Sequence, residues 1–190
     1  MITFVPIRTP RKSAPFNLGE LVDRSVGPEV QDGDVLVVSS KFIAVSEGRV
    51  VDLDSVVPSH RAASASKRLN ISPELCELVI RESDDVIGGV TGFMLTLKEG
   101  LLTPNAGIDK SNVEHGKVVL YPRNPLESAT AVVEEMRFRR GVEIGAVVSD
   151  SRLMPTRKGT VGVALAAAGI EAAPCAHSQR RRRGGHGNMK

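Results

Sequence analysis

Aromatic residues are scarce in this sequence: its 190 residues include five Phe, one Tyr and no Trp. Proteins that stack nucleic-acid bases or cage organic cations need flat rings, so both kinds of site are disfavoured. The two cysteines, Cys76 and Cys175, lie far apart, and neither belongs to a Cys/His cluster of the kind that binds zinc. The core must therefore be built from Val, Ile, Leu and Ala.

Long apolar runs are also missing. The longest, residues 161–170, contains two glycines and is too short to span a bilayer. Residues 1–16 have no apolar stretch of signal-peptide length, so we expect a soluble cytoplasmic protein. The motifs GxxxxGK[ST], GxGxxG, HExxH and GxSxG are absent as well, so any nucleotide must be bound by a different kind of motif.

The net charge of +3 arises at the end of the sequence. Residues 174–190 include Arg180, Arg181, Arg182, Arg183 and Lys190 and no acidic residue, whereas 20 basic residues face 22 acidic ones in the remainder. This segment has too few apolar residues to form a core. We therefore expect one folded domain over residues 1–173 and a disordered basic tail over residues 174–190.

The apolar patterns predict a mixture of strands and helices. Strands are expected at 34–39, 49–53, 118–121 and 142–149, and helices at 58–68, 72–82 and 125–139. Further predictions are Gly-separated strands over 85–102, a loop over 103–116, and a strand with a turn or helix over 160–170; residues 41–46 are ambiguous. Because these elements do not alternate regularly as βαβ units, the predicted fold class is α+β, with mixed sheets and packed helices.

The first candidate site is the polar segment 105–112. Gly107 permits an unusual backbone angle, and Asp109, Ser111 and Asn112 offer oxygen and amide groups within four positions. Hard cations such as magnesium take oxygen ligands of this kind, often together with phosphate oxygens. The alternative is an ordinary polar turn, since Asn, Gly and Asp are common in turns.

The second candidate follows the predicted strand 142–149. Asp150 and Ser151 would project from the end of this strand, and Arg157 and Lys158 follow closely enough to hold phosphates. In the alternative interpretation Asp150 caps a turn, and Arg152, Arg157 and Lys158 are solvated. If the Asp109 and Asp150 carboxylates lay about 4 Å apart, they would repel by about 4 kcal/mol at an effective dielectric near 20, a cost that a divalent ion between them removes.

The third candidate is Ser39-Ser40-Lys41, at the end of the predicted strand 34–39. Two hydroxyls and an ammonium at a strand end suit a nucleotide phosphate or base. The alternative is a strand that leaves the core into a polar turn.

These segments and Ser46-Glu47-Gly48-Arg49 occur in an order that resembles the coenzyme F420-0:L-glutamate ligase family, the F420 gamma-glutamyl ligases. The resemblance covers about residues 4–172. It rests on four ordered motifs, at residues 33–41, 46–49, 105–113 and 149–159.

The resemblance implies a GTP-dependent ligase that joins L-glutamate to coenzyme F420-0 through an acyl phosphate and then adds gamma-linked glutamates. It implies a gamma-glutamyl ligase-like fold and an intertwined homodimer with the active groove at the interface. The implied cofactors are magnesium or manganese, with potassium in addition. The partners would be coenzyme F420-0, L-glutamate and GTP, with no membrane.

Matching the motifs residue by residue implies roles for individual side chains. Asp109, Asp150 and Ser151 would be metal ligands. The GTP-binding residues would be Arg8, Thr9, Pro10, Ser39, Ser40, Lys41 and Asn112. Arg157 or Lys158 could stabilise the charge on the transferring phosphoryl group.

The sequence departs from the family pattern in two places. Val45 stands where the family commonly has a lysine, although Lys41 would share a face with position 45 if this stretch were helical. After Ala172 the family normally continues with a long helix that carries an acidic metal ligand and part of the GTP site, and the basic segment stands there instead. We therefore expect these 190 residues alone to have strongly reduced or no ligase activity.

Two other functions remain open. The first is a related nucleotide- and metal-dependent enzyme that forms an amide with another substrate, because no residue can be assigned to the deazaflavin. The second, more remote, is nonspecific nucleic-acid binding through Arg180–183.

Overall fold

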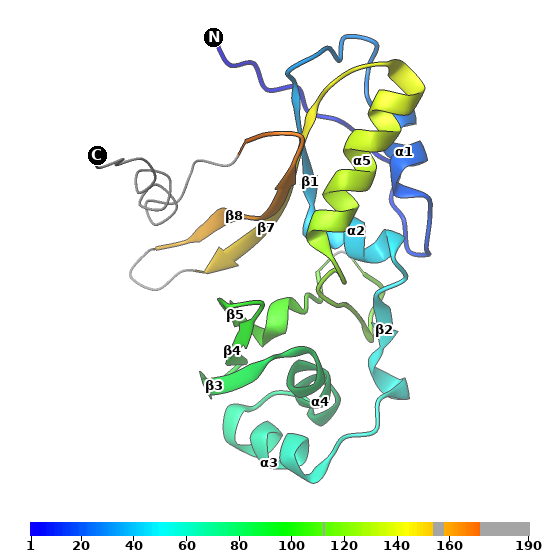
Figure 1. Cartoon of the computed structure of the whole chain (residues 1–190). Coiled ribbons are helices and arrows are strands. Elements are labelled where there is room, and N and C mark those ends of the chain that lie inside the picture. Colours follow the sequence, from blue (N-terminus) through cyan, green and yellow to red (C-terminus); the bar gives the residue numbers. More distant parts are fainter. Residues whose placement is uncertain (112, 154–157, 172–190) are drawn as a thin grey trace, which may run out of the picture.

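Two lobes, one above the other in Figure 1, make up the computed structural model, which describes residues 1–111, 113–153 and 158–171. Of these residues, the terminal lobe contains 1–49, 120–153 and 158–171, and the insert lobe contains 50–111 and 113–119. The predicted tail, 174–190, and the candidate residues Asn112 and Arg157 lie outside the described residues.

The terminal lobe is a three-stranded sheet covered by helices on one face (Figure 1). Its strand order is β1-β7-β8, with β1 parallel to β7 and β7 antiparallel to β8. The strands are β1 (Val35–Ser39), β7 (Gly145–Leu153) and β8 (Thr160–Ala168), and the helices are α1 (Leu18–Ser25), α2 (Ser40–Ser46) and α5 (Pro125–Arg140).

Helix α5 has a capping residue at each end. The Asn124 side chain accepts a hydrogen bond from the Glu127 amide, and Pro125 occupies the first turn, where its missing N–H costs nothing. Gly141 ends the helix with φ of 69°, which a side chain would disfavour. One face of the helix then buries Ala129, Val132 and Met136 in the core shared with α1 and the sheet.

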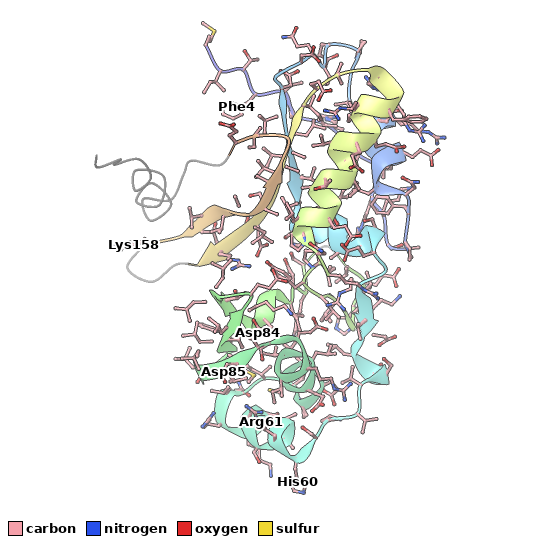
Figure 2. All side chains as sticks on the ribbon, in the orientation of Figure 1. Phe4, His60, Arg61, Asp84, Asp85 and Lys158 are labelled. Carbon is pink, nitrogen blue, oxygen red and sulfur yellow. The ribbon has the colours of Figure 1, made fainter. Side chains whose placement is uncertain are left out.

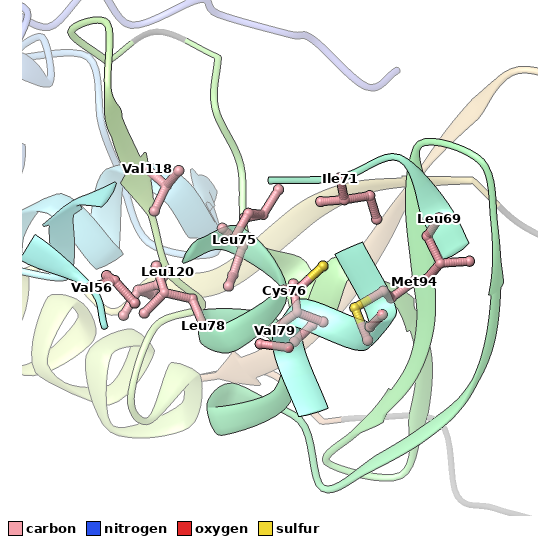
Figure 3. Close-up of a cluster of buried hydrophobic side chains, with 14 residues drawn as sticks. Val56, Leu69, Ile71, Leu75, Cys76, Leu78, Val79, Met94, Val118 and Leu120 are labelled. Carbon is pink, nitrogen blue, oxygen red and sulfur yellow. The ribbon is translucent and has the colours of Figure 1, made fainter. Parts of the chain in front are cut away.

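The insert lobe packs two helices against an antiparallel meander (Figure 1). Its elements are β2 (Val50–Asp52), η1 (Leu53–Ser55), α3 (His60–Leu69), α4 (Pro73–Glu82), β3 (Asp85–Val90), β4 (Phe93–Lys98), β5 (Leu101–Pro104), η2 (Asn105–Gly107) and β6 (Lys117–Val119). Figure 3 shows its core, where Leu75, Cys76 and Val79 of α4 lie close to Met94 of β4. The Cys76 thiol is thus part of an apolar core.

Two polar side chains of the motif Ser46-Glu47-Gly48-Arg49 make hydrogen bonds near the boundary between the lobes. The Glu47 carboxylate accepts hydrogen bonds from the Arg123 amide (2.7 Å) and the Ser128 hydroxyl (3.1 Å). Arg49 donates to the Tyr121 carbonyl (3.0 Å) and to Glu82 of α4 (2.5 Å). Glu47 therefore braces the terminal lobe, and the Arg49–Glu82 pair joins that lobe to the insert lobe.

Most predicted elements are confirmed, including the α+β class. The helices at 58–68, 72–82 and 125–139 correspond to α3, α4 and α5, and the Gly-separated strands over 85–102 to β3, β4 and β5. The ambiguous stretch 41–46 is helical, and 160–170 is mainly the strand β8. Among the residues that the structure describes, no helix is long and apolar enough to cross a membrane.

Several details differ from the prediction. Strand β7 continues to Leu153 instead of ending at 149, and the loop predicted from 103 begins only after β5 ends at Pro104. Helix α1 was not predicted, although Asn17 followed three residues later by Glu20 is a helix-start pattern. In the structure the Asn17 side chain accepts a hydrogen bond from the Glu20 amide at 2.9 Å.

Candidate active site

A cavity of about 200 Å³ lies at the boundary between the lobes. We call it the carboxylate cavity, because Asp109 of the insert lobe and Asp150 of the terminal lobe both line it. Its other lining residues are Ser40, Lys41, Thr103, Pro104, Asn105, Gly107, Ile108, Val119, Leu120, Tyr121, Pro122, Ser151, Arg152 and Thr160. The structure thus brings together Asp109, Asp150, Ser151, Ser40 and Lys41, which the sequence had placed in three separate candidate sites.

Asp150 is held by two neighbours. The Ser40 hydroxyl donates to Asp150 Oδ1 at 2.9 Å, and Arg152 Nε donates to Asp150 Oδ2 at 3.0 Å. Asp150 and Arg152 are two residues apart on β7, so they point to the same face of the sheet. Both carboxylate oxygens are therefore oriented before any ligand arrives.

Arg152 is the most deeply buried charged residue of this site, at 4% exposure. Its Nη1 donates to the Thr103 hydroxyl at 2.9 Å, and its guanidinium carbon lies 5.8 Å from the centre of the Tyr121 ring. Nη2 is buried and has no hydrogen-bond partner within the described part of the chain. The alternative interpretation, in which Arg152 is a solvated surface charge, is wrong.

Asp109 is fixed through its backbone as well as its side chain. Its N–H and C=O pair with Val119 at 2.9 and 2.8 Å. Its carboxylate accepts a hydrogen bond from the Ser111 amide at 2.5 Å and forms an ion pair with Lys41. Partial burial raises the pKa of Asp109, but the hydrogen bonds from Lys41 and Ser111 outweigh burial and hold this pKa below its ordinary value.

The turn before Asp109 is strained and well supported. Asn105, Ala106 and Gly107 all have positive φ, and a side chain on Gly107 would come within 2.8 Å of the Tyr121 ring. The Asn105 side chain accepts from the Met94 amide at 2.9 Å, and the Ala106 amide donates to the Thr96 hydroxyl at 3.0 Å. The prediction that Gly107 takes an unusual backbone angle is confirmed, and the turn delivers Asp109 to the cavity.

A second cavity, of about 380 Å³, adjoins the first at Lys41. We call it the N-terminal cavity; it is lined by Thr9, Pro10, Arg11, Lys12, Ser39, Lys41, Phe42, Val45, Val113 and Val119. It therefore collects Thr9, Pro10, Ser39 and Lys41, which are four of the residues expected to bind GTP. Lys41 and Val45 share this lining, as predicted for a helical stretch.

Other expected site residues do not line these two cavities. Arg8 and Lys158 are exposed, and Lys158 lies just before β8 (Figure 2). Asn112 and Arg157 are outside the described residues, so their predicted roles stay predictions.

The sequence did not point to Tyr121 or Thr103. Tyr121 lies under Arg152, and Thr103 accepts the hydrogen bond that fixes the Arg152 guanidinium. A period-two pattern extended from Val148 through Asp150 would have placed Arg152 beside Asp150. Tyr121 and Thr103 carry no comparable local signal, because their position depends on contacts between strands far apart in sequence.

The donor groups of the carboxylate cavity suit a divalent cation. Each carboxylate already attracts a cation from the chain, Lys41 at Asp109 and Arg152 at Asp150. Magnesium typically takes one or two protein carboxylates and completes its shell with water and phosphate oxygens. Across residues 1–111, 113–153 and 158–171 there is no group of three or more His, Cys, Asp or Glu side chains placed to hold a metal.

Comparison with known proteins gives the family of the chain. The model of the F420-0:Gamma-glutamyl ligase family matches residues 6–188, past residue 172, where we expected the resemblance to end. The chain is 32% identical over 167 residues to the coenzyme F420:L-glutamate ligase of Methanopyrus kandleri, covering 87% of this chain and 66% of that protein. The proteins of the same name from Methanocaldococcus jannaschii and Archaeoglobus fulgidus are 34% and 35% identical, each over 82% of this chain and over 61% and 62% of their own lengths.

The chain belongs to the F420-0:gamma-glutamyl ligase family. It spans about three-fifths to two-thirds of the length of these relatives.

Proposed function

We propose that this protein is a GTP-dependent ligase that joins L-glutamate to coenzyme F420-0 and then adds further gamma-linked glutamates. Family membership and the names of the relatives support the ligase class and the substrates. The single structural observation behind the proposal is that Asp109 and Asp150, from different lobes, line one cavity that adjoins a second cavity at Lys41.

In the proposed reaction a carboxylate oxygen of F420-0 attacks the γ-phosphorus of GTP, and GDP leaves. The amine of L-glutamate then attacks the carbonyl carbon of this acyl phosphate, and phosphate leaves as the amide forms. Phosphoryl transfer of this kind depends mostly on positioning and on stabilising charge. A divalent ion held by Asp109, Asp150 and Ser151 would withdraw negative charge from the γ-phosphate.

The chain's own residues have definable parts in this scheme. Ser40 and Arg152 orient the Asp150 carboxylate, because each donates to a different oxygen. Thr9, Pro10 and Ser39 would contact the nucleotide in the N-terminal cavity, with Lys41 supplying positive charge between the two cavities. Arg8, Ser40, Asn112, Arg157 and Lys158 keep the roles that the family resemblance implies, with magnesium or manganese, and potassium in addition, as the proposed cofactors.

The test is formation of glutamylated F420 by the purified chain, supplied with Mn²⁺, GTP, F420-0 and L-glutamate and followed by mass spectrometry, which detects product even at the strongly reduced rate expected of these 190 residues. Product and GDP should appear in equal amounts, and only when both F420-0 and glutamate are present. Asp109→Asn and Asp150→Asn should lower the rate about a hundredfold, the typical effect of removing one charge-stabilising group. Asp54→Asn, at an exposed aspartate of η1, is the matched control and should leave the rate unchanged.

Binding provides a second measurement that does not need turnover. Calorimetric titration of Mn²⁺ with GDP should show weaker binding to Asp150→Asn than to Asp54→Asn. Equal binding would remove Asp150 from the metal site. GTP consumption coupled to another acid and amine, with none for F420-0, would instead identify a related amide-forming enzyme.

A further inference from the structure

The two carboxylates of the cavity differ in how firmly their cationic partners are held. Arg152 is buried and is also anchored to Thr103 at 2.9 Å, so it cannot leave Asp150 without losing both contacts. Lys41 is different, because about a quarter of its side chain and more than a third of that of Asp109 are exposed. Its second contact is with the Ser111 hydroxyl, at 2.7 Å, which is exposed as well.

The partly exposed Lys41–Asp109 ion pair is inexpensive to break. Pairs between partly exposed lysine and carboxylate side chains typically contribute about 0–1 kcal/mol, because water screens them and two long side chains must be ordered. The lysine ammonium is a compact charge on a flexible four-carbon stem, whereas a buried guanidinium is held by several fixed hydrogen bonds. Of the two cations, therefore, Lys41 is the one that an incoming metal ion can displace.

The Lys41 ammonium also has a second cavity within its reach. It lies near the start of α2 and lines both the carboxylate cavity and the N-terminal cavity. Close to it in the N-terminal cavity, Val45 is 7% exposed and offers no charge. An ammonium released from Asp109 would thus meet nucleotide phosphates from helix α2 without a change in the backbone.

We propose that Lys41 is a displaceable counter-ion that couples metal binding to nucleotide binding. Without ligands its ammonium neutralises Asp109; when a divalent cation takes the Asp109 carboxylate, the ammonium turns to the nucleotide phosphates. The inference rests on the proposed function in that it takes Asp109 to be a metal ligand. Lys41 acts here as a positioning residue, and its effect is on affinity.

The proposed exchange of partners by Lys41 predicts the direction in which metal affinity and nucleotide affinity change. A metal ion binding alone must break the Lys41–Asp109 pair, so Lys41 weakens metal binding in the absence of nucleotide. With nucleotide present the released ammonium gains a phosphate partner, so each ligand strengthens the other. By linkage the metal must raise nucleotide affinity by the same factor as nucleotide raises metal affinity.

The experiment measures Mn²⁺ affinity by calorimetry or by the spin resonance of free Mn²⁺, with and without GDP. Lys41→Met should bind Mn²⁺ alone about two- to fivefold more tightly than the wild type, the equivalent of an exposed ion pair. GDP should raise the Mn²⁺ affinity of Lys41→Met by a smaller factor than that of the wild type. Lys41→Arg keeps the positive charge and should not bind Mn²⁺ more tightly than the wild type.

Lys110→Met is the matched control, because Lys110 follows Asp109 directly and is exposed. It removes one positive charge beside Asp109, as Lys41→Met does, and should not produce the full gain in Mn²⁺ affinity. Thermal melting of each variant checks that the fold is intact.

Equal or weaker Mn²⁺ binding by Lys41→Met, an equal gain in Lys110→Met, or no Mn²⁺ binding by the wild type would each overturn the proposal. Failure of the proposed function is a separate result: the affinities could follow the exchange while no glutamylated F420 is formed. Conversely, product formation without the affinity changes would reject only the role of Lys41.

Discussion

Tyr121 reports on the electrostatics of the carboxylate cavity. Burial raises its pKa to about 12, helped by the Glu99 carboxylate and opposed by Arg152. Because the sequence has one tyrosine and no tryptophan, tyrosinate absorbance measures this single group without interference. The side chain is therefore an intrinsic probe placed at the centre of the site.

We expect the phenol of the folded protein to titrate near pH 12, against about 10 in the unfolded chain. Because the fold favours the neutral phenol, this contribution to stability is complete below about pH 10 and is lost as the pH rises towards 12. Absorbance at alkaline pH, recorded with and without urea, measures both midpoints. A folded-state midpoint near 10 would contradict the buried position of Tyr121.

Two variants should move this midpoint in opposite directions. Glu99→Gln removes a charge that raises the pKa of Tyr121, so its midpoint should fall. Arg152→Met removes a charge that lowers this pKa, so its midpoint should rise, provided that a melting curve shows the variant to be folded.

At the scale of elements, Glu77 joins α4 to the start of α3. Its Oε2 accepts the Ser59 amide at 2.8 Å, and its Oε1 accepts Arg81 Nε at 2.7 Å. Ser59 is the N-cap of α3, so the carboxylate fixes the angle at which that helix begins. The hydrogen bonds from Ser59, followed by that from Arg81, lower the pKa of Glu77 from 4.5 to about 2.

Glu77→Gln should lower the melting temperature at pH 7, because the helix junction loses its charged acceptor. The folded state favours the ionised carboxylate, so its contribution is complete above about pH 4.5 and is lost as the pH falls through about 2. Melting temperatures of the variant should therefore depend less on pH between about 5 and 2 than those of the wild type. Glu134→Gln, at an exposed position of α5, is the control and should follow the wild type.

Elements with their own end signals could be predicted from the sequence. Ser72-Pro73 marks the start of α4, and Asn124-Pro125 and Gly141 mark the two ends of α5. Helix α2, at seven residues, is too short to show a helical period. Strand β7 extends past its predicted end because Arg152 donates a hydrogen bond to the Asp150 carboxylate. With their charges paired in this way, polar residues can continue along a buried face of the strand.

The candidate site could be predicted only in part for a related reason. Asp109, Asp150 and Lys41 were identified by type and by family resemblance, but their meeting depends on the pairing of β1 with β7 and of Asp109 with Val119. Such register is decided by the packing of whole lobes. The burial of Arg152 follows from that packing and could not be predicted from its neighbours in the sequence.

At the scale of the whole molecule, strand β1 leaves apolar side chains exposed on one face of the terminal sheet, within the part of the chain that the structure describes. Val35 and Val37 on β1 point away from the α5 side, where Leu36 is buried, and they are 48% and 68% exposed. Phe4, 89% exposed, projects near the same lobe (Figure 2). Apolar groups gathered in this way favour contact with another protein surface, and we propose a second copy of the chain, as the family resemblance implies.

Sedimentation velocity should accordingly give a species of twice 20.3 kDa. Val37→Asp places a charge among these exposed apolar side chains and should shift the equilibrium towards monomer by tenfold or more, since burying an unpaired charge is costly. Val57→Asp is the matched control, at a valine of the insert lobe that is 79% exposed, and it should leave the dimer intact. A wild type that stays monomeric at high concentration would reject the proposed dimer.

The chain leaves and re-enters the terminal lobe at one point. Val50 of β2 pairs with Val119 of β6, and the Leu120 amide donates to the Arg49 carbonyl at 2.9 Å. Residues 50–119 thus form an insertion with a hydrophobic core, and its two ends lie close enough to be bridged by a short turn. Excision of this segment would carry Asp109 away and leave Asp150 behind, so neither piece alone would hold both carboxylates.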